Sequence, residues 1–115
     1  MNLSELQQTL RTFAAERNWE EFHTPKNLSM ALMVEAAELM ELFQWQTPQE
    51  SRATRLNPTL QIRVGEELAD VALYLLQLAD QTGVDLDLAI ADKLVKNARK
   101  YPVPSQHATH DSMGP

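Results

Sequence analysis

The chain has 115 residues, the length of one small domain, and it contains no cysteine, so disulfides, thiolate nucleophiles and thiolate metal sites are excluded. Its 10 basic and 16 acidic side chains give a net charge of −6, which argues against binding of a nucleic-acid polymer, because Lys and Arg hold phosphate backbones. No apolar run approaches the about 20 residues that span a membrane, so we expect a cytoplasmic protein without a membrane segment.

The first predicted helix begins near the N-terminus. The sequence SELQ fits a capping box, with Ser4 as the N-cap and Gln7 three residues into the helix. Leu6, Leu10 and Phe13 then recur at helical spacing. The same stretch is amphipathic and lacks a long apolar core, so it does not resemble a signal peptide.

Three later segments begin with a capping residue followed by proline, a pair typical of a helix start: Thr24-Pro25, Thr47-Pro48 and Asn57-Pro58. These signals predict a second helix over residues 25–46, a short turn of helix within residues 47–56, and a third helix over residues 58–82. Gly83 is suited to end the third helix. Gly65 lies inside it, at a cost of about 1 kcal/mol relative to Ala, and close backbone packing would explain its presence.

A fourth helix is predicted to begin after Asp85 and to end before Pro102. The sequence contains no alternating pattern typical of strands, so the expected fold is all-α, a bundle of four main helices in one domain over residues 1–103. Residues 104–115 lack apolar periodicity and are expected to form a flexible tail. A chain this short buries only about two thirds of its unfolded surface, so association with further copies would enlarge its core.

Two acidic pairs interrupt the most apolar helices. Glu35 and Glu38 are three residues apart, as are Glu67 and Asp70, so each pair shares one helix face. Helices that are apolar nearly all round are expected to be buried, and ionised carboxylates are unfavourable there unless they are paired. If the two helices pack antiparallel, four carboxylates meet in one cluster. An all-oxygen cluster of this kind suits Mg²⁺ or Mn²⁺.

The residues alone leave other interpretations open. The acidic pairs would also fit the solvated faces of a non-catalytic helical dimerisation module. Arg63 can reach Glu66 or Glu67 along its helix, whereas Glu35 and Glu38 have no Lys or Arg within a turn of helix. A di-iron site is excluded, because it requires Glu-x-x-His motifs that these helices lack. Tryptophans near helix ends often complete a core, and Lys and Asn four residues apart often form a solvent-facing stripe.

The segments VEAAELMELFQW, EELADVALYLLQLA and KLVKNARKYP together resemble the all-α nucleoside triphosphate pyrophosphohydrolases of the MazG type. The resemblance is strongest to their small dCTP pyrophosphatase branch, in which RNWEEFHTPKNLSMAL also has a counterpart. It extends over roughly residues 5–103.

The resemblance implies a Mg²⁺-dependent enzyme with a housecleaning role. Such an enzyme hydrolyses a (deoxy)nucleoside triphosphate, with dCTP-like substrates expected, between the α- and β-phosphates. The products are a nucleoside monophosphate and pyrophosphate. The implied metal ligands and catalytic residues are Glu35, Glu38, Glu67 and Asp70. The implied substrate-binding residues are Trp19, Trp45 and Tyr74 around the base, with His23, Lys93 and Asn97 as polar contacts. The implied assembly is a homodimer or homotetramer that completes the helical bundle.

Two positions depart from the family pattern. Val34 stands where many MazG proteins have a second Glu, which agrees with the dCTP branch. Leu10 stands where some relatives in that branch have a His near the base. The alternative to a dCTP-like substrate is therefore a hydrolase with broad base specificity.

Overall fold

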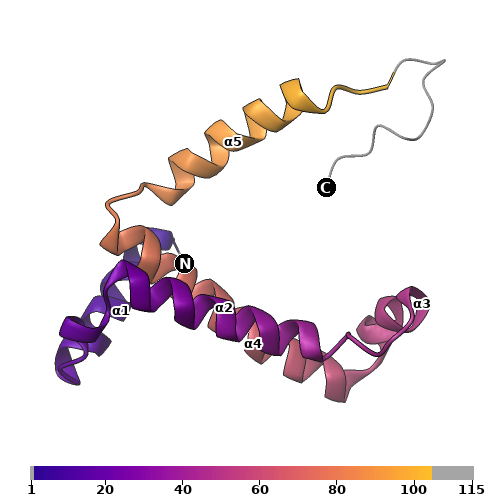
Figure 1. Cartoon of the computed structure of the whole chain (residues 1–115), viewed down its shortest axis with the longest axis horizontal. Coiled ribbons are helices and arrows are strands. Elements are labelled where there is room, and N and C mark those ends of the chain that lie inside the picture. Colours follow the sequence, from indigo (N-terminus) through magenta and orange to yellow (C-terminus); the bar gives the residue numbers. More distant parts are fainter. Residues whose placement is uncertain (1, 105–115) are drawn as a thin grey trace. The chain divides into compact units, whose positions relative to one another are not determined.

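All regular structure in the described part of the chain is helical. The computed structural model describes residues 2–104, in which five α-helices and two 3₁₀ helices occur and no strand is found (Figure 1). The predicted all-α class is confirmed. The chain divides into two compact units, Met1–Gly83 and Val84–Pro115, and each is described by itself. Most of the predicted tail, from residue 105 onward, lies outside the described residues.

Helix α1 (Leu3–Glu16) begins earlier than the sequence predicts. The Asn2 side chain accepts a hydrogen bond from the Glu5 N–H at 2.8 Å and is the N-cap. The prediction that Ser4 caps this helix is therefore wrong, because the cap two residues earlier places Ser4 inside the first turn. After α1 the chain forms the 3₁₀ helix η1 (Glu20–Phe22).

Helix α2 (Pro25–Glu41) starts at the predicted cap but ends five residues early. The Thr24 side chain accepts a hydrogen bond from the Asn27 N–H. Beyond Glu41, the Leu42 and Phe43 N–H groups donate to carbonyls three residues back, as in a tightened turn. The predicted extension to residue 46 is wrong, because residues 42–46 form tighter turns, in which the Gln46 N–H also donates to a carbonyl three residues back.

The short helix predicted in the connection is confirmed as α3 (Pro48–Arg52), followed by η2 (Ala53–Leu56). Thr47 and Glu50 form a reciprocal capping box at the start of α3, with both hydrogen bonds at 3.1 Å. Helix α4 (Pro58–Gln81) follows the Asn57 cap and ends before Gly83, whose φ of +70° is the left-handed conformation that favours glycine.

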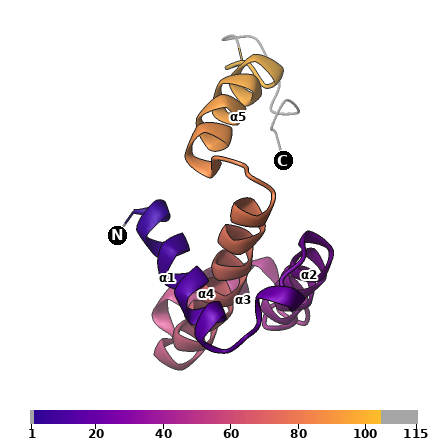
Figure 2. The ribbon, with the colours of Figure 1, turned by 90° about the vertical axis from the view of Figure 1, so that its left-hand side faces the viewer.

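Three helices of Met1–Gly83 pack together. Helices α2 and α4 lie antiparallel and side by side, and α1 packs against α4, which therefore lies between the other two (Figures 1 and 2). Arg11 on α1 joins α4 through two hydrogen bonds to the Asp80 carboxylate, at 2.7 and 3.0 Å. The Gln7 amide adds a bond to the Leu76 carbonyl at 3.0 Å. Polar contacts thus fix α1 on the C-terminal half of α4.

The two long helices are less buried than their composition predicts. The buried apolar side chains of the described residues are Ala14, Leu28, Leu76 and Ala79, of which Leu28 is fully buried. Several large apolar side chains on α2 and α4 are more than 40% exposed: Met30, Met33, Val34, Met40, Ile62, Leu68 and Leu75. The expectation that these helices are buried is wrong for the single chain, because α4 packs mainly on α2, with smaller contacts to α1 and η2.

Gly65 has open space around it. A Cβ atom added there would meet no atom within 4 Å beyond the backbone of its own helix. Close packing within this chain therefore does not explain the glycine.

Helix α5 (Leu86–Lys100) forms the regular part of the second unit. The Asp85 side chain accepts from the Leu88 N–H, which confirms the predicted cap, and the helix ends just before Pro102. Lys96 pairs with Asp92 at 3.0 Å along its surface. Across residues 2–104, no helix combines the length and hydropathy needed to cross a membrane.

Candidate metal centre

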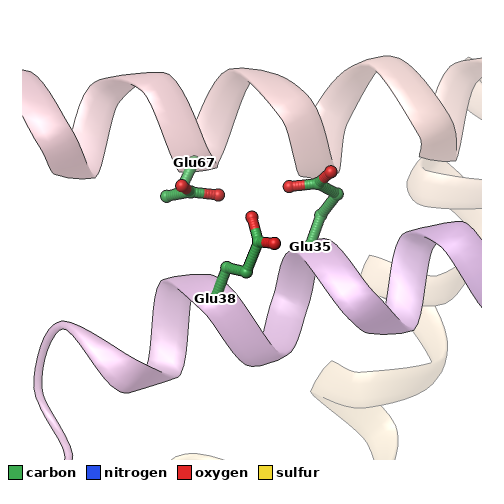
Figure 3. A group of neighbouring side chains, drawn as sticks. All are labelled: Glu35, Glu38 and Glu67. Carbon is green, nitrogen blue, oxygen red and sulfur yellow. The ribbon is translucent and has the colours of Figure 1, made fainter.

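The packing of α2 on α4 brings three acidic side chains together. Glu35 and Glu38 project from α2, and Glu67 projects from the facing side of α4 (Figure 3). One carboxylate oxygen from each lies within 4.8 Å of those of the other two. The spacing of three residues places both α2 carboxylates on the face that meets α4. We call these three residues the acidic cluster.

Asp70, the fourth predicted ligand, does not join this close group. It lies three residues beyond Glu67 on α4, and its side chain is exposed. Its charge nevertheless contributes to raising the pKa values of Glu35 and Glu67. Asp70 is therefore near enough to add to the negative potential of the acidic cluster.

The acidic cluster is electrostatically unfavourable without a cation. Burial is the largest cause that raises the pKa of Glu35 to about 7, followed by the neighbouring carboxyl group of Glu38. Burial and the charge of Glu38 also raise the pKa of Glu67. One oxygen of Glu35 and one of Glu67 are buried without a hydrogen-bond partner. Among residues 2–104, no Lys or Arg forms an ion pair with the cluster.

These features fit a hard divalent cation. The donor atoms are all carboxylate oxygens, the ligand type that Mg²⁺ and Mn²⁺ prefer, and neither His nor Cys belongs to the group. Buried polar atoms normally have partners, and a bound cation would provide partners for the two orphaned oxygens. It would also offset the like charges that raise the two pKa values.

A second feature lies at the other end of α4. A pocket of about 300 Å³ is enclosed by α1, η1 and the C-terminal half of α4. Its lining includes Leu10, Arg11, His23, Gln77, Asp80 and Gln81. The Trp19 ring lies 6.2 Å from the His23 ring and meets Phe13 edge-on at 5.7 Å. The structure thus brings Trp19 and His23, two predicted substrate-binding residues, together beside a pocket at the small end of the usual range for ligand sites.

The sequence does not predict the ion pair between Arg11 and Asp80 in this pocket. The two residues are 69 positions apart, and neither belongs to a motif that would link them. Only the packing of α1 on α4 reveals the contact.

Trp45 and Tyr74 lie on opposite sides of the acidic cluster. Trp45 is 90% exposed and follows the end of α2, whereas Tyr74 is half-buried on α4. Each is seven residues beyond a cluster glutamate, Glu38 or Glu67, and the two helices run in opposite directions. Trp45 and Tyr74 therefore lie on opposite sides of the acidic cluster along the α2–α4 pair. Their joint contact with one base stays a prediction.

Lys93 and Asn97 lie on α5, four residues apart and therefore on one helix face. Both are exposed in the unit Val84–Pro115. Their contact with substrate stays a prediction.

Known proteins match the chain over most of its length. The sequence model of the MazG-like family matches residues 30–114. Human dCTP pyrophosphatase 1 is 45% identical over 100 residues, which cover 87% of this chain and 59% of that protein. The Bos taurus protein of the same name is 43% identical over 88% of this chain and 60% of its own length. The chain thus spans about three fifths of these curated relatives.

A solved structure is similar to this chain in three dimensions as well. The crystal structure of a pyrophosphatase from Archaeoglobus fulgidus superposes with a TM-score of 0.76 at 40% sequence identity. The match covers 87% of this chain and 92% of that one.

Proposed function

This chain belongs to the MazG-like family, and on that premise we propose that it is a Mg²⁺-dependent nucleoside triphosphate pyrophosphohydrolase. Water attacks the α-phosphorus, and the bond between that phosphorus and the oxygen that bridges to the β-phosphate breaks. The bridging oxygen leaves with the pyrophosphate, and the water oxygen stays on the α-phosphate. The products are a nucleoside monophosphate and pyrophosphate. We further propose a dCTP-like substrate and a cytoplasmic housecleaning role for the domain over residues 1–103.

The observation that supports this proposal most strongly is the acidic cluster. Glu35 and Glu38 from α2 meet Glu67 from α4 within 4.8 Å, with two buried oxygens that lack partners. A purely decorative set of surface carboxylates would separate in water, because like charges repel. The proposed metal ligands are these three residues together with Asp70.

The reaction requires the chain to hold a strongly negative substrate although its own net charge is −6. Mg²⁺, or Mn²⁺ in its place, supplies positive charge against the phosphate oxygens when bound and makes a coordinated water more acidic. The carboxylates would hold the cation from two different helices, so the packing of α2 on α4 sets the geometry of the ligands. Packed helices hold such ligands more rigidly than loops do.

The pocket beside α1 supports a site for the nucleoside. Trp19 offers an aromatic face, 44% exposed, and His23 offers a polar contact in the pocket lining. Leu10 also lines this pocket and provides no hydrogen bond. A site discriminates strongly between substrates when it must satisfy buried hydrogen-bonding groups. An apolar side chain at this position therefore supports the alternative of broad base specificity.

We propose that the functional form is a homodimer or homotetramer. Exposed apolar side chains on α2 and α4, among them Met33 and Ile62 at 68% and 65%, would be covered by a second copy. A second copy could also bring its Trp45 to the Tyr74 side of the first chain's site. In this arrangement α1, α2, α4 and α5 form the bundle, with Lys93 and Asn97 as substrate contacts.

Pyrophosphate release from each common deoxynucleoside and ribonucleoside triphosphate, with and without Mg²⁺, tests the proposal. We expect release that requires Mg²⁺ and is fastest with dCTP. Similar rates with all bases would favour the broad-specificity alternative. No release from any nucleotide would contradict the proposed activity.

Thermal unfolding separates the enzyme from a non-catalytic dimerisation module. A ligand that binds only the folded state stabilises it by about 2.7 kcal/mol at a concentration 100 times its Kd. Mg²⁺ with a non-hydrolysable dCTP analogue should therefore raise the melting temperature of the enzyme. A module would show no such shift.

A further inference from the structure

A single basic side chain lies next to the acidic cluster along α4. Arg63 precedes Glu67 by four residues, and Asp70 and Tyr74 follow at spacings of three and four. Residues at these spacings share one helix face. Arg63 is therefore one turn from Glu67, at a distance of about 6 Å along the helix axis.

Arg63 is available to a ligand. It is exposed, and it forms none of the ion pairs found in residues 2–104, although Glu67 is at a spacing that allows one. It is also the one basic residue of α4. The one basic residue of α2, Lys26, is nine residues before Glu35 and thus more than two turns away.

The pocket and Arg63 lie on opposite sides of the acidic cluster along α4. The α4 residues that line it, Gln77, Asp80 and Gln81, lie beyond the acidic cluster on the C-terminal side. Arg63 lies on the N-terminal side. A nucleotide with its base toward the pocket and its α-phosphate at the cluster extends its remaining phosphates toward Arg63.

We infer that Arg63 binds the terminal phosphates of the substrate, the part that leaves as pyrophosphate. This inference rests on the proposed function. Arginine suits the role because its planar guanidinium donates two parallel hydrogen bonds to phosphate oxygens and stays charged at all relevant pH values. The positive charge adds to that of a cation at the cluster, where the chain otherwise presents only carboxylates.

Product inhibition distinguishes phosphate binding from a general electrostatic effect. Inhibition of dCTP hydrolysis by pyrophosphate and by dCMP is measured with Mg²⁺ for the wild type, Arg63→Gln and Arg63→Lys. Lys26→Gln serves as a matched control, because it also removes one positive charge from an exposed site. Thermal unfolding verifies that each variant is folded.

For Arg63→Gln we expect weaker inhibition by pyrophosphate, by about 10- to 100-fold, since hydrogen bonds between charged groups typically contribute that much. Inhibition by dCMP should be unchanged, the KM for dCTP should rise, and Arg63→Lys should restore part of the pyrophosphate affinity. Lys26→Gln should behave as the wild type.

Two results would overturn the inference. If Arg63→Gln matches Lys26→Gln in both inhibition constants, Arg63 does not contact the terminal phosphates, while the wild-type activity leaves the proposed function intact. An equal weakening of the inhibition by pyrophosphate and by dCMP would also overturn the inference, since a general loss of positive charge predicts that result and a contact with the terminal phosphates does not. A wild type without pyrophosphate release overturns the proposed function itself, and the role of Arg63 with it.

Discussion

Each glutamate of the acidic cluster has a distinct environment, and that environment determines its chemistry. Glu38 is exposed, whereas Glu35 and Glu67 are half-buried and each has one oxygen without a partner. Burial together with like charge stores unfavourable electrostatic energy, which a divalent cation would relieve. The cluster is therefore better suited to hold a cation than to stabilise the fold by itself.

The first prediction concerns Glu38. Glu38→Gln should lower Mg²⁺-dependent pyrophosphate release by at least about 100-fold, since even residues that only support a metal ligand change activity by 10- to 100-fold. Glu41→Gln is the matched control, because Glu41 is an exposed residue of the same helix outside the cluster. Steady-state rates across a Mg²⁺ titration measure both. Equal rates for the two variants would contradict the ligand assignment.

The second prediction concerns the pH dependence of stability. In the folded chain the pKa of Glu35 rises from its ordinary value of 4.5 to about 7, chiefly through burial. The folded state then binds the Glu35 proton more tightly than the unfolded state does. The contribution of this proton to the stability of the fold is therefore complete below pH 4.5 and is lost as the pH rises to about 7. Without divalent cations, stability should decline over this window.

Thermal unfolding in EDTA between pH 4 and 8 measures the effect. Glu35→Gln mimics the neutral carboxyl group, so its decline should be shallower than that of the wild type over the same window. Glu41→Gln should retain the wild-type slope. A Glu35→Gln curve parallel to the wild type would show that Glu35 titrates normally.

At the scale of the elements, caps determine where each helix begins, and tertiary packing determines which face is covered. Thr24, Thr47, Asn57 and Asp85 cap their helices as the sequence predicts. Asn2 replaces Ser4 because both can accept the same kind of hydrogen bond, and the earlier cap gives α1 an additional half turn. Sequence patterns alone do not decide which of two capping residues that lie two positions apart begins the helix.

The third prediction concerns Gly65. Open space surrounds its position, and it adopts ordinary helical geometry inside α4. Gly65→Ala should raise the free energy of unfolding by about 1 kcal/mol, because alanine loses less backbone entropy in a helix. Urea denaturation measures the change at a fixed protein concentration. Destabilisation would contradict the prediction and would show that a second copy approaches α4 closely at this residue.

At the scale of the whole molecule, the single chain leaves both its apolar surface and its base-binding residues incomplete. Only four apolar side chains of the described residues are buried, while large apolar residues remain exposed on α2 and α4. Trp45 and Tyr74 lie on opposite sides of the acidic cluster. Both observations agree with a proposed oligomer in which two chains contribute to each site.

The fourth prediction tests this arrangement by complementation. Trp45→Ala and Tyr74→Ala should each weaken dCTP hydrolysis when present in every chain. After the two variants are mixed, unfolded and refolded together, part of the activity should return, because some sites then combine an intact Trp45 with an intact Tyr74 from the partner chain.

A mixture of Glu38→Gln with Glu67→Gln is the matched control. Both of these residues belong to the same chain's cluster, so refolding them together should restore no activity. Recovery in the control, or none in the test mixture, would contradict the proposed division between chains.

The amino-acid sequence by itself determined the helical class, most helix starts and the existence of two acidic pairs, because these depend on local spacing and capping. The family resemblance also followed from the sequence, and the match of the MazG-like family model confirms it. The roles of the individual site residues stay predictions. The premature end of α2 at Glu41 could not be read from composition, since the apolar sequence continues through Leu42, Phe43 and Trp45.

Only the tertiary structure decided which acidic side chains meet, how far they are buried and where the pocket lies. Glu35, Glu38 and Glu67 converge because α2 and α4 pack antiparallel at one register, whereas the exposed Asp70 carboxylate lies outside this group of three. Distances between residues far apart in the chain depend on this packing. Helical periodicity determines the face on which a side chain lies, but not which side chain faces it across the interface.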